Sequence, residues 1–251
     1  MIHVETLWKR YGRQPVLRGM EFEARSGSLT LMVGPNGAGK STTMKVLAGL
    51  ARPDRGVARI GGHDLARARR RALGQLAYLP QIPNFHPRFT CTQILEFYAR
   101  LRGVASCRVG WALERTGLLD AATVPTGALS GGMRQRLGFA LLMLPDAPVL
   151  LLDEPGLSLD PEWRQALQAY LRGEADRGKA VLVTTHLLAE WNGAADRCLL
   201  CREGRIAREI DPGALADAFG APLLPGGLPA PAALSDASRS STSHACDPLP
   251  A

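Results

Sequence analysis

The stretch Gly34-Pro35-Asn36-Gly37-Ala38-Gly39-Lys40-Ser41-Thr42 decides the fold of this 251-residue chain. It matches the phosphate-binding loop pattern G-x-x-x-x-G-K-[ST] at every fixed position. The apolar run at 28–33 before it favours a buried strand, and residues 42–50 after it favour a helix. Strand, loop and helix together are the context in which this pattern binds a nucleoside triphosphate.

The residue types in the loop suit a polyphosphate ligand. Backbone N–H groups must converge on the anion, and Gly34, Gly37 and Gly39 lack the Cβ atoms that would block this approach. The N-terminus of the following helix adds unpaired N–H groups and partial positive charge. We expect Lys40 to reach the β- and γ-phosphates of ATP and the Ser41 hydroxyl to ligate Mg²⁺. The alternative is a glycine-rich turn with an incidental Lys-Ser pair, which the flanking strand and helix disfavour.

Composition and charge narrow the class of protein. The length suits one large α/β domain, and the net charge of +7 comes from scattered arginines, so it does not by itself indicate a nucleic-acid partner. The longest apolar run, 137–152, is interrupted by Pro145, Asp146 and Pro148, and the N-terminus does not resemble a signal peptide. We therefore expect a cytosolic chain, and its five scattered cysteines do not predict a disulfide framework.

Hydrophobic periodicity predicts alternating strands and helices. Strands are expected at 3–8, 17–24, 57–60, 75–79, 149–152 and 180–184, and helices at 92–101, 108–116, 133–144 and 161–172. A hairpin is expected at 199–210, and a short helical stretch after Asp211. The helices between about 82 and 146 interrupt a parallel sheet, which predicts a helical insertion. Residues 1–220 are expected to form the folded domain, and the Pro/Ala/Gly/Ser-rich residues 221–251 a disordered tail.

Three further residues complete the predicted chemistry. Asp153 and Glu154 end an all-apolar strand, and the carboxyl ends of such strands are where ligands bind in open α/β sheets. We expect Asp153 to hold Mg²⁺. A second carboxylate beside the γ-phosphate can orient or deprotonate the attacking water, which is the role predicted for Glu154. His186 follows the strand 180–184 and can hydrogen-bond the γ-phosphate.

Other features have two interpretations each. Tyr11 is either a platform for an adenine ring or an ordinary turn tyrosine. The basic cluster at 67–71 favours a solvated helix face over a specific anion or membrane contact. Cys198 and Cys201 have C-x-x-C spacing but lie on a predicted strand, where residues three apart point to opposite faces, so a structural role is favoured over a metal site. His244 and Cys246 in the tail favour a chance pairing over binding of a soft metal.

The chain resembles the nucleotide-binding subunits of ATP-binding-cassette (ABC) transporters over about residues 1–210. The most specific element is Leu129-Ser130-Gly131-Gly132-Met133-Arg134-Gln135-Arg136, which matches the signature motif of that family. Gly156 and Leu157 depart from the residues that usually follow the family's Asp-Glu-Pro triplet, which affects the expected D-loop contacts. The other family elements occur in the expected order: Tyr11 as the adenine-stacking residue, Gln81 in the Q-loop, Asp153 with Glu154 as the Walker B pair, Leu159-Asp160 at the end of the D-loop and His186 as the switch histidine.

This resemblance implies an architecture and a mechanism. It implies an α/β P-loop NTPase (RecA-like) core with an antiparallel β subdomain and an inserted α-helical subdomain. Residues 34–42 would bind ATP, and Gln81 would be both a catalytic residue and a ligand of Mg²⁺. Two cassettes, copies or relatives, would pair head to tail so that Ser130-Gly131-Gly132 caps the ATP bound by the partner. An integral membrane permease would hold the pair at the cytoplasmic face of the inner membrane, and no nucleic acid is expected.

Within the family, the chain resembles single-cassette subunits of exporter-like or maturation systems. Residues 76–103 are loosely similar to the ATPase of the copper-enzyme (nitrous-oxide reductase) maturation transporter. The alternative is a soluble ABC-type ATPase that acts on nucleic acid or ribosomes. Such proteins usually carry two cassettes or a long coiled coil, whereas this chain has one phosphate loop and a short insertion. A regulatory cassette without turnover is disfavoured by Glu154 and His186.

Overall fold

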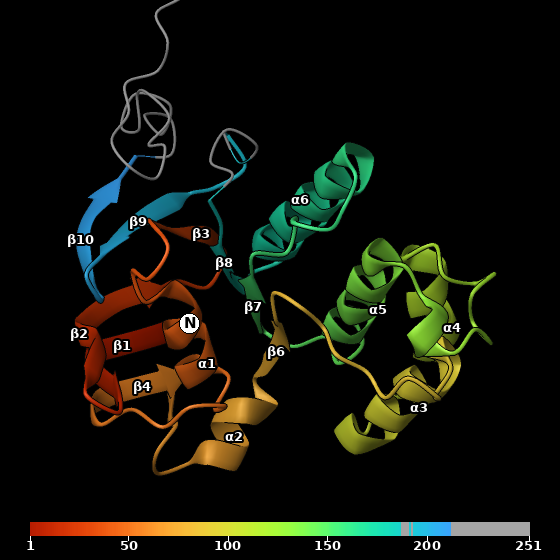
Figure 1. Ribbon diagram of the computed structural model, residues 1–251, viewed down its shortest axis with the longest axis horizontal. Helices are drawn as coiled ribbons and strands as arrows, with labels where there is room; N and C mark the ends of the chain where they lie inside the picture. Colours follow the sequence, from red (N-terminus) through yellow and green to blue (C-terminus); the bar gives the residue numbers. More distant parts are fainter. Residues whose placement is uncertain (187–190, 192, 212–251) are drawn as a thin grey trace, which may run out of the picture. The chain divides into compact units, whose positions relative to one another are not determined.

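A computed structural model of the chain describes residues 1–186, 191 and 193–211. The helical stretch expected after Asp211 and the tail expected at 221–251 lie outside these residues, as do His244 and Cys246. Figure 1 shows the helices and strands of these residues, coloured by their order in the sequence. No helix within the described ranges is both long enough and apolar enough to cross a bilayer.

A six-stranded sheet in the order β10-β9-β3-β8-β7-β6 forms the core. The strands β3, β6, β7, β8 and β9 run parallel to their neighbours, and β10 pairs with β9 as an antiparallel hairpin. The central strands are buried on both faces, which explains their unbroken apolar sequences. The bounds are Ser28–Val33 (β3), Leu76–Leu79 (β6), Val149–Asp153 (β7), Ala180–Thr184 (β8), Arg197–Arg202 (β9) and Arg205–Ile210 (β10).

Two helices cover this sheet. α1 (Lys40–Leu47) contacts β7, and α6 (Pro161–Asp176) contacts β3 and β8. Met44 and Leu47 of α1 belong to one apolar cluster with a residue from each of three neighbouring strands: Met32 of β3, Leu182 of β8 and Leu151 of β7. The phosphate loop between β3 and α1 is therefore anchored at both ends in the same core.

A second, antiparallel sheet has the order β2-β1-β4-β5. Its strands are β1 (Ile2–Tyr11), β2 (Gln14–Ala24), β4 (Arg55–Ile60) and β5 (His63–Asp64). Ile2, Met20 and Ile60 are fully buried in the cluster that also holds α1. Because alternate residues of a strand point to opposite faces, the other face of this sheet carries polar side chains.

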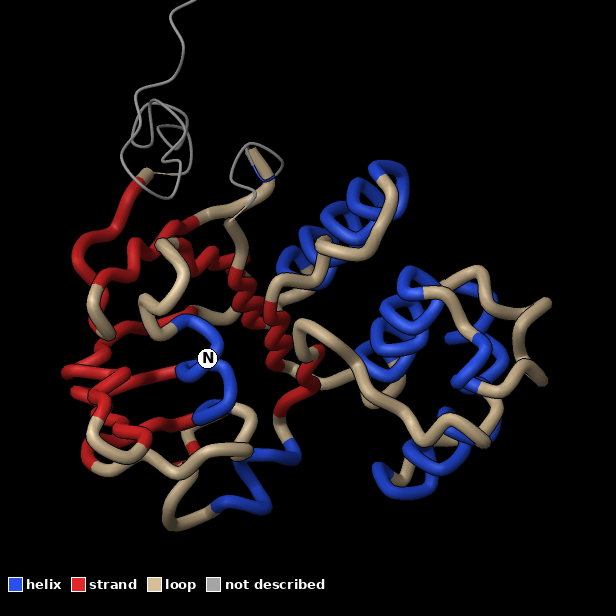
Figure 2. Tube along the Cα trace, viewed as in Figure 1, coloured by secondary structure: helices blue, strands red, loops and turns tan. Residues whose placement is uncertain are grey.

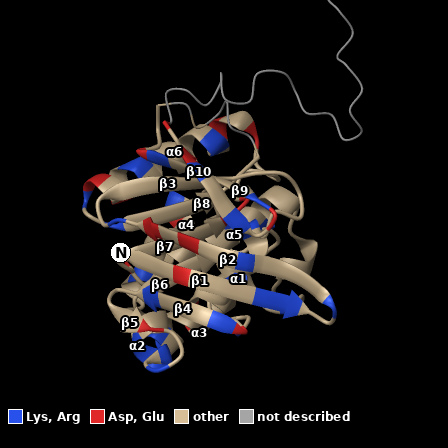
Figure 3. Cartoon of the chain, turned by 90° about the vertical axis from the view of Figure 1, so that its left-hand side faces the viewer, with Lys and Arg blue, Asp and Glu red and all other residues tan. Residues whose placement is uncertain are grey.

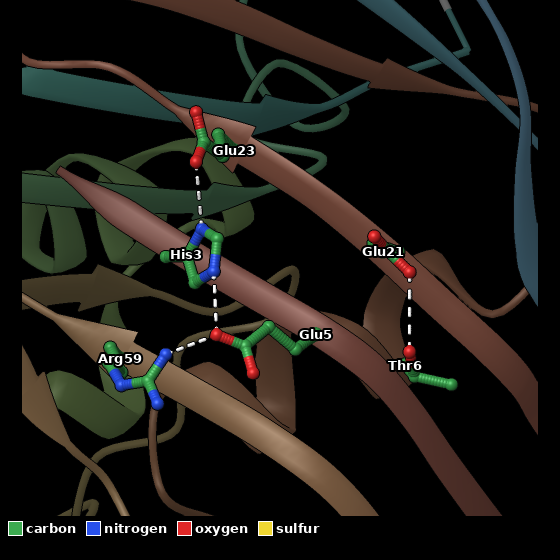
Figure 4. A network of polar contacts seen from close by, with 6 residues as sticks. All are labelled: His3, Glu5, Thr6, Glu21, Glu23 and Arg59. Atoms are coloured by element: carbon green, nitrogen blue, oxygen red, sulfur yellow. Dashed lines mark hydrogen bonds and ion pairs between the residues drawn. The ribbon is translucent and has the colours of Figure 1, made fainter.

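Polar side chains on the other face of this sheet contact one another both between strands and along β1 (Figure 4). His3 lies between two carboxylates, with Nδ1 2.9 Å from Glu23 Oε1 and Nε2 2.8 Å from Glu5 Oε1, and Arg59 pairs with Glu5. Side-chain pairs of this kind on opposite strands each contribute about 0.2–1 kcal/mol. Figure 3 marks the positions of charged residues along β1, β2 and β4 and a group of basic residues on α2 (Arg69–Gly74).

A separate group of helices forms the inserted part of the chain (Figure 2). α3 (Cys91–Arg102), α4 (Cys107–Arg115) and α5 (Gly131–Met143) share an apolar cluster of their own. α3 begins with a capping box in which Thr90 and Gln93 satisfy each other's backbone N–H groups, and it ends at Gly103 with a φ of 66°. All three helices lie within the range 82–146 expected for the insertion.

The structure corrects several predicted boundaries and adds elements. α1 begins at Lys40 and α5 at Gly131, each two residues before its predicted start, because Gly39 and Ser130 serve as N-caps. The sequence did not indicate β5 or the 3₁₀ turn Thr126–Ala128, since two- and three-residue elements have no periodicity. Arg69, Arg70 and Arg71 of the basic cluster form the start of α2 and are exposed, as a solvated helix face requires, and Arg67 is exposed just before the helix.

Candidate active site

The phosphate loop presents a buried lysine to a hollow at the edge of the sheet. Lys40 is 7% exposed, and its ammonium donates to the carbonyl oxygens of Gly34, at 2.7 Å, and Pro35, at 3.3 Å. The hydroxyl of Thr43 donates to Gly39 O at 3.0 Å and fastens the loop to the first turn of α1. Neither carbonyl acceptor carries a negative charge, so both can be exchanged for the oxygens of an anionic ligand.

The three glycines of the phosphate loop differ in what a side chain would meet at each position. At Gly37 a Cβ would meet nothing within 4 Å, so no contact within the chain requires glycine there. At Gly34 a Cβ would lie 2.2 Å from Cys201 O, and at Gly39 it would lie 2.8 Å from Leu17 Cδ2. These two glycines are needed because the loop packs against β9 and β2, a reason that the sequence did not reveal.

Oxygen atoms from three elements converge beside the loop. The Ser41 hydroxyl donates to Asp153 Oδ1 at 3.1 Å, and the Thr184 hydroxyl donates to the same oxygen at 2.6 Å. Asp153 ends β7 and pairs in register with Thr184 at the end of β8. A carboxylate beside a hydroxyl is the hard-oxygen set that Mg²⁺ prefers, so these residues fit the predicted ion.

Glu154 is held in a constrained position. Its φ of 49° is uncommon for a residue other than glycine. Its backbone N–H donates to the carbonyl oxygen of Thr184 at 3.1 Å and to the Thr184 hydroxyl at 3.0 Å. His186 Nδ1 lies 2.8 Å from Glu154 Oε2. The imidazole therefore contacts the carboxylate directly, whereas the sequence predicted only a phosphate contact for it.

A hollow of about 170 Å³ joins these parts. It is lined by Val16, Asn36, Gly37, Ala38, Gly39, Lys40, Ser41, Thr42, Gln81 and Glu154. The fold thus brings Gln81 and Glu154, far apart in sequence, to the phosphate loop. Tyr11 is 49% exposed at the end of β1 and is not among these lining residues.

The signature residues are also not among the residues that line the hollow. Ser130 caps α5 by accepting a hydrogen bond from Met133 N at 3.1 Å. Further along α5, Gln135 is 3% exposed and donates to Pro155 O at 3.1 Å. A Cβ at Gly132 would lie 3.2 Å from Ser158 O. The signature helix is therefore packed on the segment that follows Glu154 in its own chain.

The sequence analysis assigned no individual role to Thr184 or to Gln135, although Gln135 is part of the signature motif. A threonine at a strand end and a glutamine inside a helix are common, and their partners become visible only in the folded chain.

The two C-x-x-C thiols are buried on β9, and burial raises the pKa of Cys198 and of Cys201 to about 12. The described ranges contain no cluster of three potential metal-ligating side chains.

Comparison with known proteins agrees with this geometry. The family described as "ABC transporter" matches residues 17–156. The chain is 38% identical over 233 residues to the Nod factor export ATP-binding protein I of Burkholderia orbicola (strain AU 1054), an alignment that covers 91% of this chain and 77% of that protein. It is 36% identical over 211 residues to the uncharacterized ABC transporter ATP-binding protein YxlF of Bacillus subtilis (strain 168), covering 82% and 70%.

Among solved structures, the chain is similar to one described as an ATP-binding subunit of an ABC transporter. The TM-score is 0.80 at 28% sequence identity, and the match covers 88% of this chain and 93% of the other. These relatives are transporter subunits, which favours transport over the alternative of a soluble ATPase acting on nucleic acid or ribosomes. The chain belongs to the ABC transporter family, in which it is an ATP-binding and ATP-hydrolysing subunit.

Proposed function

We propose that this subunit binds Mg²⁺–ATP in the hollow beside α1. Residues 34–42 supply backbone N–H groups to the phosphates, and Lys40 exchanges its carbonyl partners for phosphate oxygens. Ser41, Asp153 and Gln81 would hold the Mg²⁺, which neutralises charge on the β- and γ-phosphates when it is bound. Tyr11 would stack on the adenine, outside the hollow that the loop residues line.

Glu154 is the proposed general base for hydrolysis. Water attacks the γ-phosphorus, its proton passes to the Glu154 carboxylate, and the bond to the leaving ADP oxygen breaks. The observation that carries this proposal is that Glu154 lines the hollow of the phosphate loop, with its carboxylate held by His186 at 2.8 Å. His186 would orient the carboxylate from one ring nitrogen and contact the γ-phosphate from the other.

The site is proposed to be completed by a second chain. The N-terminus of α5 is an anion site, because the first backbone N–H groups of a helix have no intrahelical acceptor. In α5 these include the N–H groups of Gly131 and Gly132, whereas the Ser130 side chain accepts from Met133 N. This end is not part of the hollow beside the phosphate loop of the same chain. A head-to-tail pair would place it against the ATP of the partner, so that ATP closes the pair and hydrolysis reopens it.

We propose that an integral membrane permease docks beside the Q-loop, which would place the chain at the cytoplasmic face of the inner membrane. Ile82 is 80% exposed and Phe89 50% exposed, so both apolar side chains are available for contact with a partner. Phe85, in the same segment, is partly buried against the helical core. A hollow of about 180 Å³ links this segment to α3, and its lining includes Pro83, Phe85 and Tyr98. The name of the Burkholderia orbicola relative, a Nod factor export protein, favours export as the direction.

Hydrolysis is tested with Glu154→Gln and Lys40→Ala in the purified full-length chain. Loss of a general base lowers turnover by about 10²–10⁴-fold, so Glu154→Gln should lose hydrolysis and keep ATP binding. Lys40→Ala should weaken ATP binding itself. Hydrolysis by Glu154→Gln at a near wild-type rate would show that this carboxylate is not the base.

Permease docking is tested by co-purification after Ile82→Glu and Phe89→Glu. Both variants should lose the membrane partner and keep basal ATPase activity, with Arg70→Glu on the exposed face of α2 as the matched control. If a variant that carries both Ile82→Glu and Phe89→Glu retains the partner, the docking surface lies elsewhere. Stable binding to ribosomes without a membrane partner would favour the soluble class of ABC ATPase.

A further inference from the structure

Thr184 touches both carboxylate positions of the proposed active site. Its hydroxyl donates to Asp153 Oδ1 at 2.6 Å and accepts from Glu154 N at 3.0 Å. The residue is fully buried at the carboxyl end of β8, between β3 and β7. One hydroxyl thus joins the side chain of one acidic residue to the backbone of the next.

We propose that Thr184 is a positioning residue that sets Asp153 and Glu154 for Mg²⁺–ATP hydrolysis, an inference that rests on the roles proposed for them above. A hydroxyl has one proton and can accept as well as donate. Here the proton is directed to Asp153, which leaves a lone pair for the Glu154 N–H. The two contacts are therefore compatible only in this one arrangement.

The contact to Asp153 fixes which carboxylate oxygen faces Ser41. Oδ1 accepts from both the Ser41 and Thr184 hydroxyls, at 3.1 and 2.6 Å. Two donors on one oxygen fix the plane of the carboxyl group, which would set the direction in which Oδ2 faces a bound Mg²⁺. Partners of this kind orient metal-binding carboxylates, and their loss typically costs about 10–100-fold in metal affinity or activity.

The contact to Glu154 holds a strained backbone. With a φ of 49°, Glu154 adopts a conformation that side chains other than glycine rarely take, and it persists only where the surroundings enforce it. The Thr184 hydroxyl and carbonyl oxygen both accept from the Glu154 N–H. Removing the hydroxyl leaves the N–H one acceptor, so the chain still folds while the direction of the Glu154 side chain is less well defined.

The test compares Thr184→Val with a matched control on the neighbouring strand. Valine has the shape of threonine without its hydroxyl. Thr30 on β3 is equally buried, and its hydroxyl has no hydrogen-bond partner within the described ranges, so Thr30→Val removes a hydroxyl without removing a contact. Thr184→Ser, which restores the hydroxyl, serves as the rescue variant.

Two readouts are measured on the full-length chain. The first is kcat and KM for ATP. The second does not need turnover: it is the Mg²⁺ concentration at which a non-hydrolysable ATP analogue gives half of its increase in melting temperature. Thr184→Val should lower kcat by about 10- to 100-fold, the effect of one hydrogen bond to a charged group, and raise the Mg²⁺ midpoint about tenfold or more. Binding of the analogue without Mg²⁺ should not change.

Thr30→Val should match the wild type in both readouts, and Thr184→Ser should recover most of the loss. A Thr184→Val protein with wild-type kcat and Mg²⁺ midpoint overturns the inference, as does an equal loss in Thr30→Val. If valine prevents folding, Thr184→Cys, which is similar in size and a weak donor, takes its place under the same criteria.

Glu154→Gln is measured in parallel to separate the two proposals. Near wild-type hydrolysis by Glu154→Gln refutes the general base assigned above. The Mg²⁺ midpoint, which does not depend on turnover, still decides whether Thr184 positions Asp153.

Discussion

A hydrogen bond joins α5, which begins with the signature motif, to the segment that follows β7. Gln135 on α5 is 3% exposed, and its side-chain amide donates to Pro155 O at 3.1 Å. Pro155 directly follows Glu154, so this hydrogen bond ties the helical subdomain to the loop that carries the proposed base. Replacing Gln135 with leucine keeps much of the side-chain volume and removes the donor.

The cost is estimated from the two groups involved. Loss of a neutral hydrogen bond costs about 1 kcal/mol, and a buried carbonyl left without a partner costs about 1–3 kcal/mol. Burial of the leucine side chain returns part of this free energy. We expect Gln135→Leu to lower the free energy of unfolding by about 2 kcal/mol. Hydrolysis should fall as well, because the loop after Glu154 loses its anchor.

Urea denaturation followed by circular dichroism measures the first effect, and steady-state ATPase assays measure the second. Gln165→Leu on the exposed surface of α6 is the control, for which changes within about 0.5 kcal/mol are expected. If Gln135→Leu unfolds at the wild-type urea concentration, the amide does not join the two parts of the chain as argued.

Three further results are expected. Burial raises the thiol pKa of Cys198 and Cys201 to about 12, so both should resist alkylation at pH 8 until the chain unfolds, while the exposed Cys107 reacts. Peptide mass spectrometry measures the labelling, and rapid labelling of Cys198 and Cys201 in the folded chain would contradict their burial. Gly34→Ala should lower the melting temperature and abolish ATP binding, because the added Cβ would lie 2.2 Å from Cys201 O, and wild-type behaviour would mean that the loop packs differently. A chain ending near Pro225 should keep its melting temperature and ATPase rate, and a large loss of either would show that the tail is required.

The central sheet could be predicted closely because its signals are local. Strands at 28–33 and 180–184 have the predicted bounds, since both are apolar runs bounded by turn residues. The phosphate loop and the Asp153–Glu154 pair could be found for a related reason. They are short motifs at strand ends, where parallel topology brings distant residues to one edge of the sheet.

Contacts between elements could not be predicted from local pattern. Nothing adjacent to Gly34 in sequence indicates that Cys201 packs against it, and nothing near Thr184 indicates two acidic partners. The basic cluster at 67–71 indicated a helix face, but the bounds of α2 could not be predicted because six residues provide less than two turns of periodicity.

The claim that two chains build each site is tested most directly by mixing two inactive variants. Lys40→Ala removes the phosphate contact, and Ser130→Arg blocks the N-terminus of α5, so neither should form a closed pair alone. In a mixed pair, one site carries both defects, and the other combines an intact loop with an intact signature. With Glu154→Gln in both chains to prevent turnover, ATP-dependent dimerisation is followed by analytical ultracentrifugation. The account predicts that mixing restores ATP-driven dimers, whereas a mixture as monomeric as either variant alone would contradict a shared site.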